Sequence, residues 1–132
     1  MTTLELLRKK VNDHRTDSAQ HAKRVAAFEA RAAPALLEVA RANAAKHVAA
    51  RASDGKDEAV ISISTYDLPI PWTLVSCAVH GVEAVDDYDA RVRVRGTACT
   101  ALAKEYAALG FHVSPCSDYG QFSVKGLQKV FQ

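Results

Sequence analysis

The first fifty residues carry a helical pattern that constrains the fold of this 132-residue chain more than any other feature. Fifteen of the 24 alanines lie between Ala19 and Ala52, and alanine has the highest helix propensity of all residues. Apolar residues also recur at spacings of three and four, which is the heptad register of a helix that packs along one stripe. A continuous helix of this kind would be about 70 Å long. The rest of the chain alone is too small to cover it.

Part of this helix is therefore expected to pack on another protein. Apolar side chains without cover in their own chain gain about 25 cal/mol per Å² when a partner buries them. The first 56 residues carry 11 Lys/Arg and 6 Asp/Glu, so this half is basic, and the other half is acidic. Such halves attract each other between copies, or the basic half meets an acidic partner. The predicted contact residues are Leu4, Leu7, Val11, Val25 and Phe28.

Local signals also set the limits of the helix. Thr2 and Glu5 have the spacing of a capping box at its start. The turn sequence Ser53-Asp54-Gly55 is expected to end it. Pro34 removes a helical hydrogen bond and crowds the preceding turn. We therefore expect either a kink or a break there, and the sequence leaves both open.

The remaining residues predict a small, mostly antiparallel sheet with helices on one face. Residues 59–65 (AVISIST) alternate and are β-branched, as in a strand. Residues 101–110 (ALAKEYAALG) have a helical period. Residues 86–96 fit either a helix or a strand, and this alternative stays open. The predicted fold is α+β, with a helical arm at 1–52 before a small domain at 53–132.

Residues 110–127 predict a hairpin. Two short alternating segments flank a turn that contains Pro115, Asp118 and Gly120. By the alternation of side chains along a strand, His112 should point away from the core. The side chains expected to face the core are Phe111, Val113, Phe122 and Val124.

Two pairs of cysteine and histidine raise the question of a zinc site. Cys77 and His80 are three positions apart, and His112 and Cys116 are four apart. Each spacing allows both side chains to reach one tetrahedral ion. The chain lacks the C-x-x-C pair of zinc knuckles. We therefore predict no metal and no other cofactor, and a zinc-stabilised interaction module is kept as a third alternative.

Three arginines raise the question of nucleic-acid binding. On a strand, Arg91, Arg93 and Arg95 would line one face as a basic stripe suited to phosphates. On a helix they would scatter, and the acidic residues just before them would cancel much of their field. A solvated surface is the favoured interpretation, and a small nucleic-acid-binding regulator is the alternative function.

The usual sequence signatures of enzymes are absent. The chain has no phosphate loop, no dinucleotide-binding glycine pattern, no G-x-S-x-G and no H-E-x-x-H. His14 and His21 lie with Ser18 on the helical stripe, where a polar layer fixes the register of a helix pair more often than it reacts. We predict that the protein is not an enzyme and has no catalytic residue.

The composition favours a protein outside the membrane. No stretch approaches the eighteen apolar residues of a membrane span. The N-terminal residues lack the apolar core and cleavage site of a signal peptide. The odd number of cysteines, three, favours reduced thiols. The expected location is therefore the cytosol.

The stretch from about Ala35 to Leu127 resembles small proteins of tailed bacteriophages. In these, a helix rich in lysine and alanine leads into a V-x-I-x-I strand, and a later helix ends in L-G-F/Y-x-V before a final hairpin. The matching segments here are VISIS (60–64), LGFHV (109–113) and GQFSV (120–124). The resemblance implies an α+β virion or accessory protein, and it brings no catalytic residue.

The function expected from these features is that of a non-catalytic structural or interaction protein. Within that class, the resemblance points to a virion component, located in the virion or the host cytoplasm. Its expected partner is a second copy of itself or another virion protein, bound through the N-terminal helix.

Overall fold

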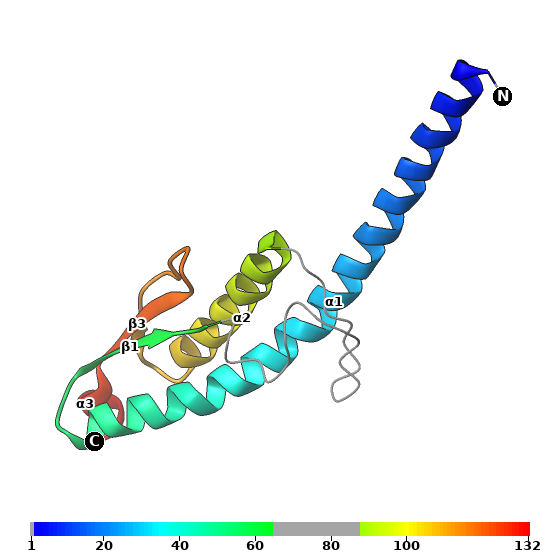
Figure 1. Ribbon diagram of the computed structural model, residues 1–132. Coiled ribbons are helices and arrows are strands. Elements are labelled where there is room, and N and C mark those ends of the chain that lie inside the picture. Colours follow the sequence, from blue (N-terminus) through cyan, green and yellow to red (C-terminus); the bar gives the residue numbers. More distant parts are fainter. Residues whose placement is uncertain (1, 65–87) are drawn as a thin grey trace.

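The structure is a computed structural model that describes residues 2–64 and 88–132. Its largest element is α1 (Thr3–Ser53), a helix of 51 residues (Figure 1). The predicted capping box is confirmed: the Glu5 backbone N–H donates to the Thr2 hydroxyl at 3.2 Å, and the Thr2 N–H donates to the Glu5 carboxylate at 3.1 Å. The helix ends at the predicted turn, where Gly55 has a φ of 75°.

Pro34 lies inside α1 and does not end it. Of the two alternatives that the sequence left open, the break is therefore wrong. The axis of α1 changes direction between its N-terminal and C-terminal parts (Figure 1). A bend is what a proline inside a helix produces, because its ring crowds the preceding turn and its nitrogen has no hydrogen to donate.

Within the described residues, three short strands form one antiparallel sheet in the order β1-β3-β2. The strands are β1 (Glu58–Ser62), β2 (His112–Val113) and β3 (Gln121–Lys125). In the register, Ile61 lies opposite Phe122 and Val113 lies opposite Val124. The predicted strand and hairpin are thus confirmed, and so is the α+β fold.

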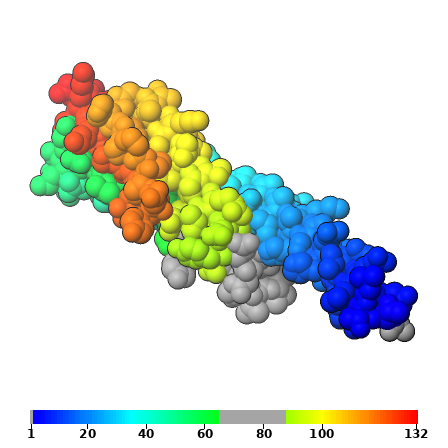
Figure 2. Space-filling view, turned by 90° about the horizontal axis from the view of Figure 1, so that it is seen from above, coloured from blue at the N-terminus to red at the C-terminus, as the bar shows by residue number. Residues whose placement is uncertain are grey.

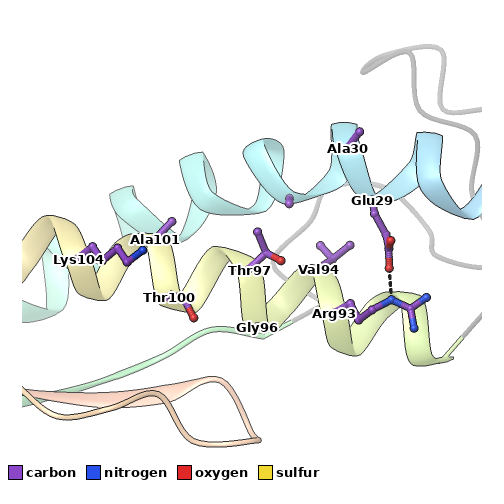
Figure 3. A pocket seen from close by; sticks show the side chains of 10 residues that line it. Glu29, Ala30, Arg93, Val94, Gly96, Thr97, Thr100, Ala101 and Lys104 are labelled. Carbon is purple, nitrogen blue, oxygen red and sulfur yellow. Dashed lines mark hydrogen bonds and ion pairs between the residues drawn. The ribbon is translucent and has the colours of Figure 1, made fainter.

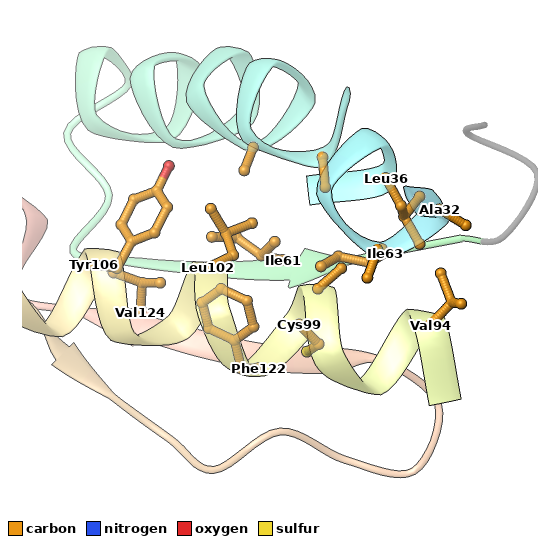
Figure 4. Close-up of a cluster of buried hydrophobic side chains, with 14 of the residues drawn as sticks. Ala32, Leu36, Ile61, Ile63, Val94, Cys99, Leu102, Tyr106, Phe122 and Val124 are labelled. Carbon is orange, nitrogen blue, oxygen red and sulfur yellow. The ribbon is translucent and has the colours of Figure 1, made fainter. Parts of the chain in front are cut away.

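Alternation along the strands gives the sheet one buried face. The buried side chains of β1 and β3 are Ala59, Ile61, Phe122 and Val124. Their neighbours on the other face, among them Val60, are exposed or half-buried. Two helices, α1 and α2 (Tyr88–Ala108), cover the buried face. Figure 4 shows Leu36 of α1 and Leu102 of α2 directed toward the strands. This is the predicted arrangement with helices on one face.

From Tyr88 onward, residues 86–96 are helical, which corrects the strand alternative. Side chains every four positions along α2 are buried, as a helix packed on a sheet requires. They are Ala90, Val94, Ala98, Leu102 and Tyr106. The R-V-R-V alternation that suggests a strand is overridden by this longer pattern, and Gly96 lies exposed in the helix instead of ending a strand.

The helices α1 and α2 lie side by side and run in the same direction, with a constant sequence offset between the residues that pair. Glu29 pairs with Arg93, and Arg41 pairs with Glu105, and both pairs are 64 positions apart in the sequence. The Arg41 guanidinium donates from Nη2 to Glu105 Oε1 at 2.7 Å and from Nε at 3.1 Å. This carboxylate raises the pKa of Arg41. Both ion pairs are exposed and therefore add little stability. They show which residues of the two helices lie side by side.

A short C-terminal helix, α3 (Leu127–Val130), closes the end of the core. The Gln128 side-chain amide donates to the carbonyls of Ala52 and Lys56 at 2.9 and 2.8 Å. Its backbone N–H donates to the Asp57 carboxylate at 3.2 Å. These bonds hold α3 against the turn between α1 and β1.

Candidate interaction surface

Residues 3–24 of α1, called the arm below, extend away from the folded core. Every one of these residues is exposed. The first buried residue of α1 is Val25. Figures 1 and 2 show the arm projecting from one end of an elongated molecule. Its 22 residues give a rod of about 33 Å. The free helix is therefore shorter than the predicted arm of 1–52, because the second half of α1 belongs to the core.

The arm carries an exposed group of large aliphatic side chains near its N-terminus. Leu4 and Leu7 are each 56% exposed, and Val11 is 46% exposed. These three share one side of the helix by their spacing of three and four, and they are called the apolar stripe below. Leu6, 47% exposed, lies away from the stripe, on the other side of the helix. The heptad pattern alone did not identify Leu6, because it falls outside the a and d positions.

Val25 and Phe28 continue the same heptad track but do not belong to the exposed surface. They are 9% and 3% exposed, and they pack in the core of their own chain. The prediction that they contact a partner is corrected by this burial. The periodicity placed them on the right side of the helix, but it could not show that the chain itself covers that side from Val25 onward.

Polar residues occupy the middle of the arm on the side of the apolar stripe. His14, Ser18 and His21 follow Val11 at spacings of three and four, and all are exposed. The whole arm has six Lys/Arg and three Asp/Glu, a net charge of +3. The arm thus has a short apolar segment near its N-terminus, followed by a basic, polar segment.

The three arginines of the predicted stripe do not line one face. At about 100° per residue, Arg93 points to the other side of α2 from Arg91 and Arg95. Arg93 is paired with Glu29 of α1, and Arg95 Nη2 donates to the Asp118 carbonyl at 2.7 Å. The basic stripe expected on a strand is therefore wrong, because the segment is a helix and two of its arginines bind parts of the same chain.

The residues considered for zinc are only partly within the described structure. Cys77 and His80 lie outside the described residues. His112 is exposed on β2, and Cys116 lies half-buried in the β2–β3 loop. Within 2–64 and 88–132, no three His, Cys, Asp or Glu side chains gather as a metal site would require. Cys116 instead meets Cys99 of α2, with 2.9 Å between the two Sγ atoms.

A shallow groove of about 820 Å³ runs between α1 and α2 (Figure 3). Small side chains form most of its walls, and the Glu29–Arg93 pair lies at one end. Apart from this ion pair, its polar groups are two threonine hydroxyls and Lys104. The small wall residues are Ala30, Ala33, Gly96, Thr97, Thr100 and Ala101.

None of the helices within the described ranges has an apolar stretch long enough to cross a lipid bilayer. No protein-family model, no curated protein and no solved structure matches this chain.

Proposed function

We propose that this is a non-catalytic interaction protein that associates with a second copy of itself through the arm. The observation that carries the proposal is the apolar stripe, three large aliphatic side chains about half exposed on a helix with no cover from the described chain. Most of the stability of helices in proteins comes from packing of an apolar face, and the described residues give the arm no such packing. A second helix packed along the stripe would stabilise it.

The pattern along the arm favours two parallel arms in register. In that arrangement, Leu4, Leu7 and Val11 each meet their own counterpart, and the polar residues behind them also meet their counterparts. In an antiparallel pair of full overlap, the aliphatic side chains would instead face His21, Ser18 and His14. Lys10 of one copy would lie near Arg15 of the other, and this like-charged pair opposes the parallel seam by only a few tenths of a kcal/mol.

The size of the stripe implies a weak contact. Six half-exposed aliphatic side chains, three from each copy, contribute roughly 5–9 kcal/mol on burial. Bringing two molecules together costs roughly 4–15 kcal/mol. A single pair of arms is therefore weak, and a lattice of many copies makes such contacts effective. A need for many copies fits a virion component, which is the role that the phage resemblance implies. We extend the proposal to that role.

Limited digestion with trypsin tests whether the arm becomes covered on association. The arm offers cleavage sites at Arg8, Lys9 and Lys10. We expect the rate constant for cleavage at these sites to fall as protein concentration rises, because association buries the helix and suppresses fraying. Cleavage at Lys125, an exposed residue of β3 in the folded core, is the internal control and should not change. Equal arm cleavage at all concentrations would contradict the proposal.

A further inference from the structure

Cys99 and Cys116 bring two free thiols together from separate elements of the fold. Cys99 lies on the buried side of α2 and is 0% exposed (Figure 4). Cys116 lies half-buried in the loop between β2 and β3. Both cysteines are unbonded, and their Sγ atoms are 2.9 Å apart. The sulfur atoms of a disulfide are about 2.05 Å apart. A relative movement of less than about 1 Å therefore closes the bond.

The loop that carries Cys116 is held in place on both sides of the cysteine. Before it, the Ser114 hydroxyl accepts from the Ser123 N–H at 2.8 Å. After it, the Ser117 N–H donates to the Gln121 carbonyl at 2.8 Å, and Arg95 of α2 donates to the Asp118 carbonyl at 2.7 Å. These bonds hold the Cys116 side chain against α2, so the two sulfurs are prepositioned for a reaction with each other.

Gly120 adds a steric reason for the close approach of the loop to α2. Its φ is +74°, and a Cβ at this position would lie 2.8 Å from Cγ and Cδ of Arg95. A glycine therefore lets the loop lie directly on the arginine that anchors it. The backbone and Arg95 together fix the loop position without help from the sulfurs.

The two thiols differ in accessibility, and burial also affects the acidity of Cys99. Burial, and secondarily Cys116, raises the pKa of Cys99 to about 12, so Cys99 is a thiol at neutral pH. Cys116 is the more exposed of the two. A reagent from solution therefore reaches Cys116 first, and Cys99 reacts afterwards as the resolving group.

We propose that Cys99 and Cys116 form a redox pair that closes to an intrachain disulfide by exchange with a low-molecular-weight disulfide such as glutathione disulfide. The Cys116 thiolate attacks one sulfur of the reagent, whose S–S bond breaks and releases one glutathione thiolate. Cys99 then attacks Cys116 Sγ, which breaks the mixed disulfide, and the proton of Cys99 passes to the departing glutathione sulfur, which leaves as the second thiol. Two protein thiols are oxidised, and one glutathione disulfide is reduced to two thiols.

The bond would tie the hairpin loop to α2 and close a segment of 17 positions. Closing a loop of this size restricts the unfolded chain, and we expect the oxidised protein to melt about 5–10 °C higher than the reduced protein. The arm contains no cysteine. The proposal therefore stands apart from the proposed association, and neither result decides the other.

The test uses the full chain with Cys77→Ser, which leaves only the proposed pair. After treatment with glutathione disulfide and removal of the excess, we expect two fewer free thiols, a mass lower by two hydrogens and no retained glutathione. Adding dithiothreitol should restore both thiols and lower the Tm. Two thiols still free in the folded protein after treatment, or a disulfide between chains, would overturn the proposal.

Two further variants in the same background test the order of the steps. Cys99→Ser should accumulate a stable glutathione adduct on Cys116, because no resolving thiol remains. Cys116→Ser should leave Cys99 unmodified while the protein stays folded. The thermal unfolding transition of each variant is measured separately, and a Tm for that variant shows that it is folded. Equal modification of the two single cysteines in folded proteins would contradict the assigned roles.

Discussion

Replacing Phe122 with alanine is expected to lower the free energy of unfolding by about 3–5 kcal/mol. The side chain is 2% exposed and lies opposite Ile61 in the sheet. Its ring centroid is 6.3 Å from that of Tyr106 on α2. Removing the ring leaves a cavity where the sheet meets α2, and a rigid backbone on both sides limits how far the cavity collapses.

Urea denaturation followed by circular dichroism measures this loss. Tyr119→Ala is the matched control, because it removes an aromatic ring that is 78% exposed in the same hairpin, and it should change stability by at most about 0.5 kcal/mol. Similar losses in both variants would show that the buried sheet face does not form the core described above.

The double substitution Leu7→Glu/Val11→Glu is expected to weaken self-association at least 100-fold, roughly 2.7 kcal/mol. It replaces two of the three side chains of the apolar stripe with carboxylates. In a parallel pair, the new charges of the two copies would face each other in the seam, where like charges repel and lose water. The dissociation constant from sedimentation velocity over a range of concentrations gives the effect.

The control is Thr16→Glu/Gln20→Glu, which makes the same change in net charge on the opposite side of the arm. It should leave the dissociation constant nearly unchanged. Neither pair of substitutions touches the core, so at protein concentrations too low for association both proteins should unfold at the wild-type temperature. If both variants associate as strongly as the wild type, the apolar stripe is not the interface.

Local signals in the sequence sufficed to predict the beginning of α1 and the hairpin. The capping box between Thr2 and Glu5 involves residues three apart, and the alternation around Phe122 reports one face of a sheet. The helix at Tyr88–Ala108 was harder to predict. Over five residues, its R-V-R-V segment fits a strand, and the helical period becomes clear only when about twenty residues are compared. Its buried positions from Ala90 to Tyr106 become decisive once α1 and the sheet are in place.

The sequence predicted the candidate site only where all of its residues belong to one helix. The apolar stripe follows from the spacing of Leu4, Leu7 and Val11 within one helix. The burial of Phe28 depends on where the core ends along α1, which no heptad pattern encodes. The meeting of Cys99 and Cys116 depends on how the hairpin loop lies against α2, and the only sequence sign was that Cys99 shares the apolar side of a helix with Leu102.

The central claim is that the arm, which the described residues leave uncovered, is an association helix. The most direct test is the mass from sedimentation equilibrium, compared between the full chain and a chain that begins at Val25. We expect the full chain to exceed the monomer mass increasingly with concentration, and the shortened chain to remain a monomer with an unchanged unfolding temperature. A monomeric full chain at every concentration, or equal association of both chains, would contradict the claim.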